Sequence, residues 1–146
     1  CALPISACVY FILCLGAWDQ LLGNYNGICI MSLGFMMSRC LSGIGVITFP
    51  KARTDGTVAE FSRNASEIAV RNVLITMFVI LAALMIWVDP VLGVLAAVSA
   101  LLVFWWYHYM ALKYFGGTTG DLSGFFLCIC EVVMALVLAL GGTFNL

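Results

Sequence analysis

The chain has 146 residues, of which 64% are hydrophobic and 9% are charged, and its formal net charge is −1. A soluble domain carries about 25% charged residues, so this composition, with a mean hydropathy of +1.15, indicates a protein that folds in lipid. The small net charge gives no basis for nucleic-acid binding. The seven cysteines lie almost wholly in apolar runs, which favours membrane-helix residues over a disulfide framework.

Five apolar segments follow one another, each close to the roughly 20 helical residues that cross a hydrocarbon core. They cover residues 2–18, 28–49, 68–88, 91–112 and 125–140. Continuous apolar runs favour helices, which satisfy their own backbone in lipid, over the alternating strands of a barrel. We therefore predict an all-α, polytopic membrane bundle of about five helices that forms one domain over residues 1–146.

Positive charge is confined to alternate connections between these segments. The connections at 19–27 and 89–90 hold no lysine or arginine, whereas those at 51–67 and 113–124, with their flanks, hold Lys51, Arg53, Arg63, Arg71 and Lys113. The positive-inside rule predicts that 51–67 and 113–124 face the cytoplasm of a bacterial inner membrane. Soluble reactants would reach these two connections, so we expect function there.

The connection at 113–124 contains a polar, glycine-rich stretch that ends in a carboxylate. Glycine permits positive φ and close backbone approach, and amides ahead of a helix bind anions, so phosphate binding is predicted for Gly116, Gly117, Thr119 and Gly120. Asp121 offers the hard oxygen that suits Mg²⁺. A loop tightened for packing and a carboxylate at a helix start explain the same residues, and both alternatives stay open.

Two charged residues, Arg39 and Glu131, fall near the middle of apolar segments. Placing an arginine at the bilayer centre costs ~2.5–3.5 kcal/mol on insertion scales, so Arg39 is expected to have a polar partner. Either its guanidinium binds a substrate phosphate, or it forms a structural ion pair with Glu131 or Asp121. Glu131 carries a similar cost. On one helix Asp121 and Glu131 would stand ~15 Å apart, too far to share a metal ion. Gly34, Ser38 and Ser42 recur every four residues, which predicts close helix packing.

Lys51 and Arg53 form a short basic segment directly after Pro50. Their charge and the turn-prone residues around them suit phosphate binding. They also fit a topology signal that contacts lipid headgroups, and this second explanation stays open.

Two blocks of sequence resemble the cobalamin synthase family, the adenosylcobinamide-GDP ribazoletransferases. They are Ser38-Arg39-Cys40-Leu41-Ser42-Gly43 with Thr48-Phe49-Pro50-Lys51-Ala52-Arg53, and Phe115-Gly116-Gly117-Thr118-Thr119-Gly120-Asp121-Leu122-Ser123-Gly124 with Glu131 after it. The resemblance implies a membrane transferase that uses Mg²⁺ in the last stages of vitamin B12 (cobalamin) biosynthesis. It would join adenosylcobinamide-GDP to α-ribazole or α-ribazole 5′-phosphate and release GMP. It also implies that Arg39, Lys51, Asp121 and Glu131 line the reaction cavity, with Asp121 and Glu131 as the candidate catalytic residues.

The family's N-terminal half carries further acidic motifs, including a His-x-Asp-Gly sequence, that this chain does not contain. The chain also opens in an apolar run without methionine, so we expect it to be a C-terminal piece that is inactive alone. The rival class is a small transporter or channel subunit in which Arg39 and Glu131 line a polar path. A non-catalytic membrane assembly subunit, with the small residues Gly34, Ser38 and Ser42 as its interface, is the third class. Membrane lipid and a second copy of the chain in a homo-oligomer are further expected partners.

Overall fold

The computed structural model describes residues 2–50 and 67–143, and the secondary-structure elements in these ranges are helices. They are α1 (Ala2–Leu21), α2 (Tyr25–Thr48), α4 (Glu67–Val88), α5 (Pro90–Phe115) and α6 (Gly120–Thr143). Within α4 the span is Ile68–Val88, and α2, α5 and α6 are likewise long and apolar enough to cross a membrane, while α1 contributes the shorter apolar stretch Ala7–Leu21. The protein is a multi-pass, all-α membrane bundle, as the sequence predicts.

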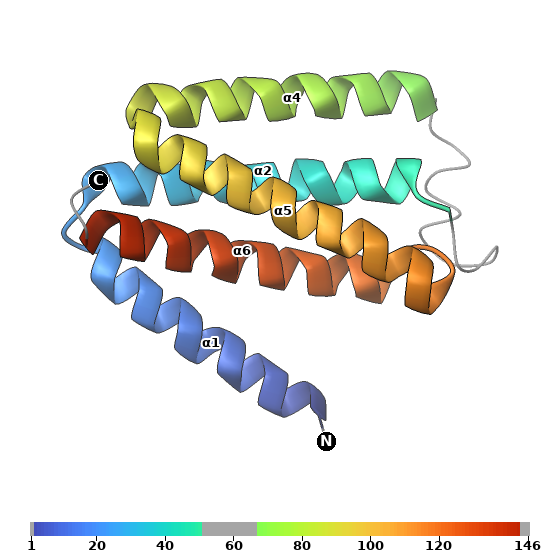
Figure 1. Cartoon of the computed structure of the whole chain (residues 1–146), viewed down its shortest axis with the longest axis horizontal. Coiled ribbons are helices and arrows are strands. Elements are labelled where there is room, and N and C mark those ends of the chain that lie inside the picture. The colour runs from blue at the N-terminus through green and yellow to red at the C-terminus, as the bar shows by residue number, and fades with distance from the viewer. Residues whose placement is uncertain (1, 51–66, 144–146) are drawn as a thin grey trace.

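Helix α2 lies at the centre of the bundle and packs against α4, α5 and α6 (Figure 1). Helices α4 and α5 form one antiparallel pair, and α5 and α6 form the next. Helix α1 packs on α6 and hardly contacts α2. The N-terminal part of α1 diverges from the other helices (Figure 1).

Short polar side chains fix where several helices begin. Asn24 accepts a hydrogen bond from the Gly27 amide at 3.1 Å and caps α2. Asp89 caps α5 by accepting from the amides of Val91 and Leu92, at 3.0 and 3.1 Å, with Pro90 in the first helical position.

The predicted connections were too long, because the helices continue past the apolar residues. Helix α5 runs through Phe115 and α6 begins at Gly120, so the connection predicted at 113–124 shrinks to 116–119. The connection predicted at 19–27 shrinks to 22–24 for the same reason. Polar residues in the last helical turns can face water at the membrane surface, so hydropathy marks the lipid-embedded part of a helix rather than its ends.

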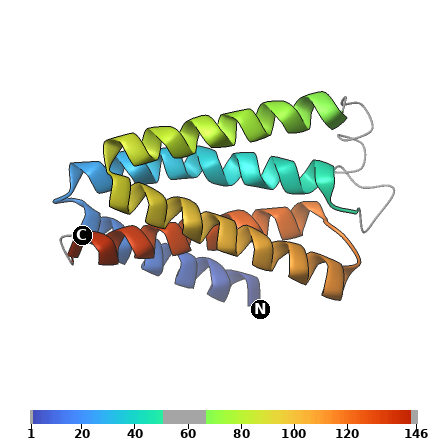
Figure 2. The same cartoon turned by 45° about the horizontal axis from the view of Figure 1, so that its top comes forward.

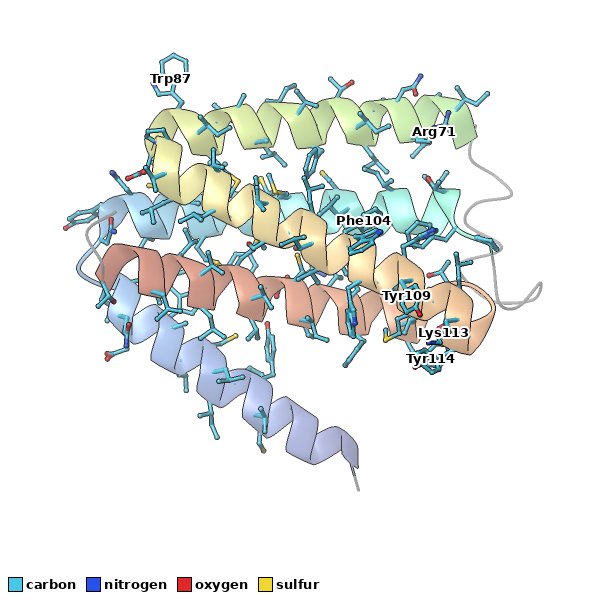
Figure 3. All side chains as sticks on the ribbon, in the orientation of Figure 1. Arg71, Trp87, Phe104, Tyr109, Lys113 and Tyr114 are labelled. Atoms are coloured by element: carbon cyan, nitrogen blue, oxygen red, sulfur yellow. The ribbon has the colours of Figure 1, made fainter. Side chains whose placement is uncertain are left out.

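The end of α2 and the 116–119 connection are bound to each other. The Thr118 amide donates to the Pro50 carbonyl at 2.8 Å, and the buried Thr118 hydroxyl is hydrogen-bonded to the buried Tyr107 hydroxyl. The starts of α4 and α6 lie at the same end of the bundle (Figure 2). Arg71 of α4 and Lys113 of α5 also lie there, and Trp87 lies at the opposite end (Figure 3). The helix ends that flank the two predicted connections therefore lie at one end of the bundle, while residues 51–66 themselves lie outside the described residues.

The small residues of α2 face α6, so the predicted close helix packing is confirmed. A Cβ atom on Gly34 would lie 3.3 Å from the Met134 sulfur, and the hydroxyls of Ser42 and Ser123 are 2.6 Å apart. Ser38 is fully buried in the same interface. The absence of larger side chains lets the two helices approach closely and brings polar groups of α2 within reach of α6.

Candidate functional site

The candidate residues separate into two groups at different depths of the bundle. The first, which we term the membrane-depth cluster, consists of Tyr10, Ser38, Arg39 and Glu131. The second, the end loop, consists of residues 116–121 at the end of the bundle where α2 stops. The two candidate catalytic residues fall in different groups. Asp121 and Glu131 are ten residues apart in α6, or ~15 Å along its axis, and cannot act on one atom.

Glu131 is the centre of the membrane-depth cluster and is only 5% exposed. The Tyr10 hydroxyl donates to Glu131 Oε2 at 2.9 Å, and the Ser38 hydroxyl lies 3.4 Å from Oε1. Arg39 Nη2 approaches Oε1 at 3.3 Å. Both carboxylate oxygens therefore have hydrogen-bond donors, which offset the cost of placing a carboxylate inside the bundle.

Arg39 pairs with Glu131 and not with Asp121, which settles between the two partners that the sequence left open. The pair is loose, because charge-assisted N–H···O bonds usually measure about 2.7–2.9 Å. The Arg39 side chain remains 64% exposed. It lies nine residues before the end of α2, ~14 Å along the axis, and therefore at the depth of the hydrocarbon core.

Three helices assemble this cluster. Ser38 and Arg39 are neighbours on α2, Glu131 is at the middle of α6, and Tyr10 reaches Glu131 from α1. Sequence reasoning missed Tyr10, because a single aromatic residue in an apolar run fits a membrane helix. The position of Tyr10 in the sequence could have indicated its role. Tyrosine favours membrane interfaces, whereas Tyr10 is the lone tyrosine of its segment and lies in the middle of it.

In the end loop, the glycines terminate α5. Gly116 has a φ of 66° and forms the left-handed C-cap. The Gly117 amide donates to the Ala111 carbonyl at 3.0 Å, and the Thr118 amide is bound to Pro50. These two amides are therefore occupied. For Gly116 and Gly117 the structure directly supports the packing explanation, and anion binding by them stays a prediction.

The start of α6 is the part of the end loop that still offers donors. Thr119 Oγ1 accepts from the Leu122 amide at 3.3 Å, and the Thr119 carbonyl accepts from the Ser123 amide at 3.0 Å. Within residues 2–50 and 67–143, the amides of Gly120 and Asp121 have no recorded acceptor. They occupy the positive end of the helix dipole, which favours an anion.

Asp121 lies in the first turn of α6 and its side chain is exposed. In the described part of the chain, no group of three His, Cys, Asp or Glu side chains is placed to hold a metal ion. Asp121 can therefore supply one ligand but not a complete site. Lys51 and Arg53, the other predicted phosphate-binding residues, lie outside the described residues.

Comparison with known proteins places these features in a family. The sequence profile of cobalamin-5-phosphate synthase (CobS) matches residues 4–139. The chain is also 38% identical over 139 residues to an adenosylcobinamide-GDP ribazoletransferase of Lachnoclostridium phytofermentans. The match covers 94% of this chain and 52% of that relative, in its C-terminal part, so the chain spans about half of the relative's length. No solved structure matches the chain. Because the profile match covers nearly all of the described helices, the chain belongs to the cobalamin-5-phosphate synthase family.

Proposed function

We propose that this chain corresponds to the C-terminal part of a membrane transferase that joins adenosylcobinamide-GDP to α-ribazole or α-ribazole 5′-phosphate. GMP is the second product, and the reaction belongs to cobalamin biosynthesis. Family membership and the name of the 38% identical relative support this proposal. Since the chain spans about half of that relative, we expect turnover from the longer protein and none from these residues alone.

The bond between Thr118 and Pro50 is the observation that carries the location of the reaction. It holds the glycine-rich block against the end of α2, after which Lys51 and Arg53 follow in sequence. The open amides of Gly120 and Asp121 start α6 at the same end. We assign substrate phosphates to this end, where helix-dipole and basic groups stabilise the charge that spreads in phosphoryl-type transfer.

The proposed reaction is a substitution at phosphorus. A hydroxyl oxygen of the ribazole forms a bond to the β-phosphorus of adenosylcobinamide-GDP, and the bond from that phosphorus to the oxygen of GMP breaks. The hydroxyl proton passes to a base. Asp121 is the exposed carboxylate at this end among the described side chains, and it is our candidate for that base.

Magnesium stays a proposal, because the described side chains do not assemble a metal site. Mg²⁺ keeps several waters and is often held by one or two carboxylates together with substrate phosphates. Asp121 is suited to be one such carboxylate. The remaining ligands would come from the substrate and from the part of the longer protein that this chain does not cover.

The orientation is proposed from charge. Arg71 and Lys113 lie at the end that carries the Thr118–Pro50 bond, and among the described residues the opposite end has no lysine or arginine. The positive-inside rule then places this end in the cytoplasm of a bacterial inner membrane, where nucleotide-linked substrates are found.

A transporter or channel is less well supported. A polar path would need to continue from the membrane-depth cluster to the far end of the bundle. Apart from Ser99, whose hydroxyl donates to the Ala96 carbonyl of its own helix, the described buried side chains on that side are apolar and include Leu21, Ile30, Met31, Leu92 and Leu138. We propose that Arg39 and Glu131 form the floor of a reaction cavity, ~15 Å deeper than Asp121.

Asp121→Asn in the full-length protein tests this proposal. The amide keeps the size of the carboxylate and removes its charge and basicity, so we expect GMP release to fall by about 10²–10⁴-fold. The assay supplies adenosylcobinamide-GDP, α-ribazole and Mg²⁺ to membranes that hold the protein. Asp89→Asn, which changes a carboxylate at the opposite end, is the matched control and should retain activity. Normal GMP release from Asp121→Asn would remove Asp121 from the mechanism.

A further inference from the structure

A continuous stripe of exposed residues runs along α2, the helix that is otherwise the most enclosed in the bundle. We term it the α2 stripe, and its members are Tyr25, Cys29, Ser32, Met36 and Arg39. They follow one another at steps of four and three, so all lie on one face of the helix. Successive four- and three-residue steps are the spacing with which one helix packs along another.

The α2 stripe differs in chemistry from a face that meets lipid. Helix α4 exposes Arg71 and Asn72 near its start, but beyond Thr76 its exposed side chains are apolar, among them Val79, Ile80 and Leu84. The Ser32 hydroxyl of the α2 stripe donates to the Ile28 carbonyl of its own helix, but the stripe also carries the exposed guanidinium of Arg39, nine residues before the end of α2. Hydrocarbon offers no acceptor to the open N–H groups of Arg39, so lipid alone is a poor neighbour for this face.

None of the described helices, α1 included, covers the α2 stripe, because its residues are exposed. Helix α1 contacts α2 only weakly, and its N-terminal part diverges from the other helices (Figure 1). Cys128 and Asp121, on the first half of α6, are also exposed. Tyr10 is the point at which α1 still reaches the polar centre of the bundle.

The matched relative contains chain that would fill such a space. This chain aligns with 52% of the relative, in its C-terminal part, so close to half of the family fold precedes the aligned region. We propose that the α2 stripe is the surface on which this preceding half of the family fold docks, with a helix that places an anionic side chain opposite Arg39. The anion is required because Arg39 has one loose carboxylate contact and is otherwise open. This inference rests on the family match and not on the proposed activity.

Site-specific photo-cross-linking tests the docking. The relative's part that precedes its aligned region is fused to this whole chain, with a protease site at the junction. A photo-cross-linking residue replaces either Met36 on the α2 stripe or Val79 on α4, which are 59% and 58% exposed. After irradiation and cleavage, the two pieces should stay joined from position 36 and separate from position 79.

A charge comparison gives a second measurement. Arg39→Gln should lower the cross-linked fraction at position 36 by roughly tenfold, because loss of one partner leaves a desolvated charge unpaired. Arg71→Gln, at an exposed arginine of α4, should leave that fraction unchanged. The thermal unfolding temperature should fall further with Arg39→Gln in the fusion than in the isolated chain, which loses only the loose contact with Glu131.

Three results would overturn the proposal. One is cross-linking of position 36 to a second copy of the chain, and another is cross-linking only to lipid. The third is equal joining from positions 36 and 79. If the fusion does not insert stably into the membrane, the same cross-linking comparison is made at the aligned positions of the full-length relative. The proposal is therefore tested in one protein or the other.

Discussion

At the scale of single residues, the structure explains how the ionisable side chain of Glu131 is tolerated at a depth where the bilayer disfavours a charge. Glu131 is nearly inaccessible and receives the Tyr10 hydroxyl, the Ser38 hydroxyl and the Arg39 guanidinium. The three donors come from two other helices, so each bond also ties α6 to a neighbour. In lipid such interhelical hydrogen bonds contribute about 0.6 kcal/mol on average and ~1.7 at most.

Tyr10→Phe tests the bond from α1. The change removes one hydroxyl and keeps the ring, so we expect the free energy of unfolding in detergent micelles to fall by about 0.6–1.7 kcal/mol. Tyr25→Phe is the matched control, because Tyr25 is 85% exposed and its hydroxyl has no recorded partner in the described part of the chain. Equal effects of the two changes would show that the Glu131 bond does not stabilise the bundle.

Substitution by alanine should have opposite effects on stability at Gly116 and at Gly124. Gly116 has a φ of 66°, a conformation that costs a residue with a side chain about 1–2 kcal/mol. Gly124 lies within α6 with open space around it, where alanine should stabilise the helix by about 0.5–1 kcal/mol. We therefore expect Gly116→Ala to lower the thermal unfolding temperature and Gly124→Ala to raise it. The reverse order would contradict the assignment of Gly116 as the C-cap of α5.

At the scale of elements, the α4–α5 pair depends on a close approach of two backbones. A Cβ atom added to Gly93 would lie 2.4 Å from the Met85 carbonyl oxygen. That oxygen belongs to the last turns of α4 and already accepts from the Asp89 amide at 3.2 Å. Backbone atoms cannot move aside as a flexible side chain can, so glycine is required where α5 turns back along α4.

Gly93→Ala should consequently weaken the α4–α5 pair. Overpacking of this kind costs about 1–3 kcal/mol, and we expect a loss of that size in the free energy of unfolding. Gly16→Ala in α1, where a Cβ would meet nothing within 4 Å, serves as the control and should be neutral or stabilising. Unchanged stability of the Gly93 variant would show that the helices separate at little cost.

At the scale of the whole molecule, the chain places most of its functional candidates at one end. The Thr118–Pro50 bond joins segments almost seventy residues apart in sequence, and Tyr107 secures it from within the bundle. Asp121, Lys113 and the end of α2 gather there, whereas Asn24 and Asp89 cap helices at the opposite end. The predicted orientation of the chain in the membrane is based on this difference between the two ends of the bundle.

Cysteine labelling in intact cells tests the topology. In a variant without native cysteines, single cysteines replace Thr48, Tyr114, Tyr25 or Trp87, all of which are exposed. A membrane-impermeant maleimide should modify positions 25 and 87 from outside, and positions 48 and 114 only after the cells are opened. Labelling of positions 48 and 114 from opposite sides would contradict a shared end for the two connections.

Much of the fold followed from the sequence, because hydropathy reports directly on burial in lipid. The five apolar segments became five helices, and the four-residue spacing of Gly34, Ser38 and Ser42 became the α2–α6 interface. Helix ends were predicted less well, since Phe115 and Gly120 are set by capping geometry and not by apolarity. The partner of Arg39 could not be chosen from sequence, because both Glu131 and Asp121 were compatible with the spacing.

The sequence by itself determined the class of the protein, the number of its apolar helices and the family resemblance, because these depend on composition and on the order of motifs along the chain. Only the tertiary structure decided that Arg39 pairs with Glu131, that Tyr10 joins Glu131 and that the α2 stripe is exposed. These features depend on how helices distant in sequence rotate and lean against one another. Packing between helices fixes that geometry, and the pattern within any one helix leaves it undetermined.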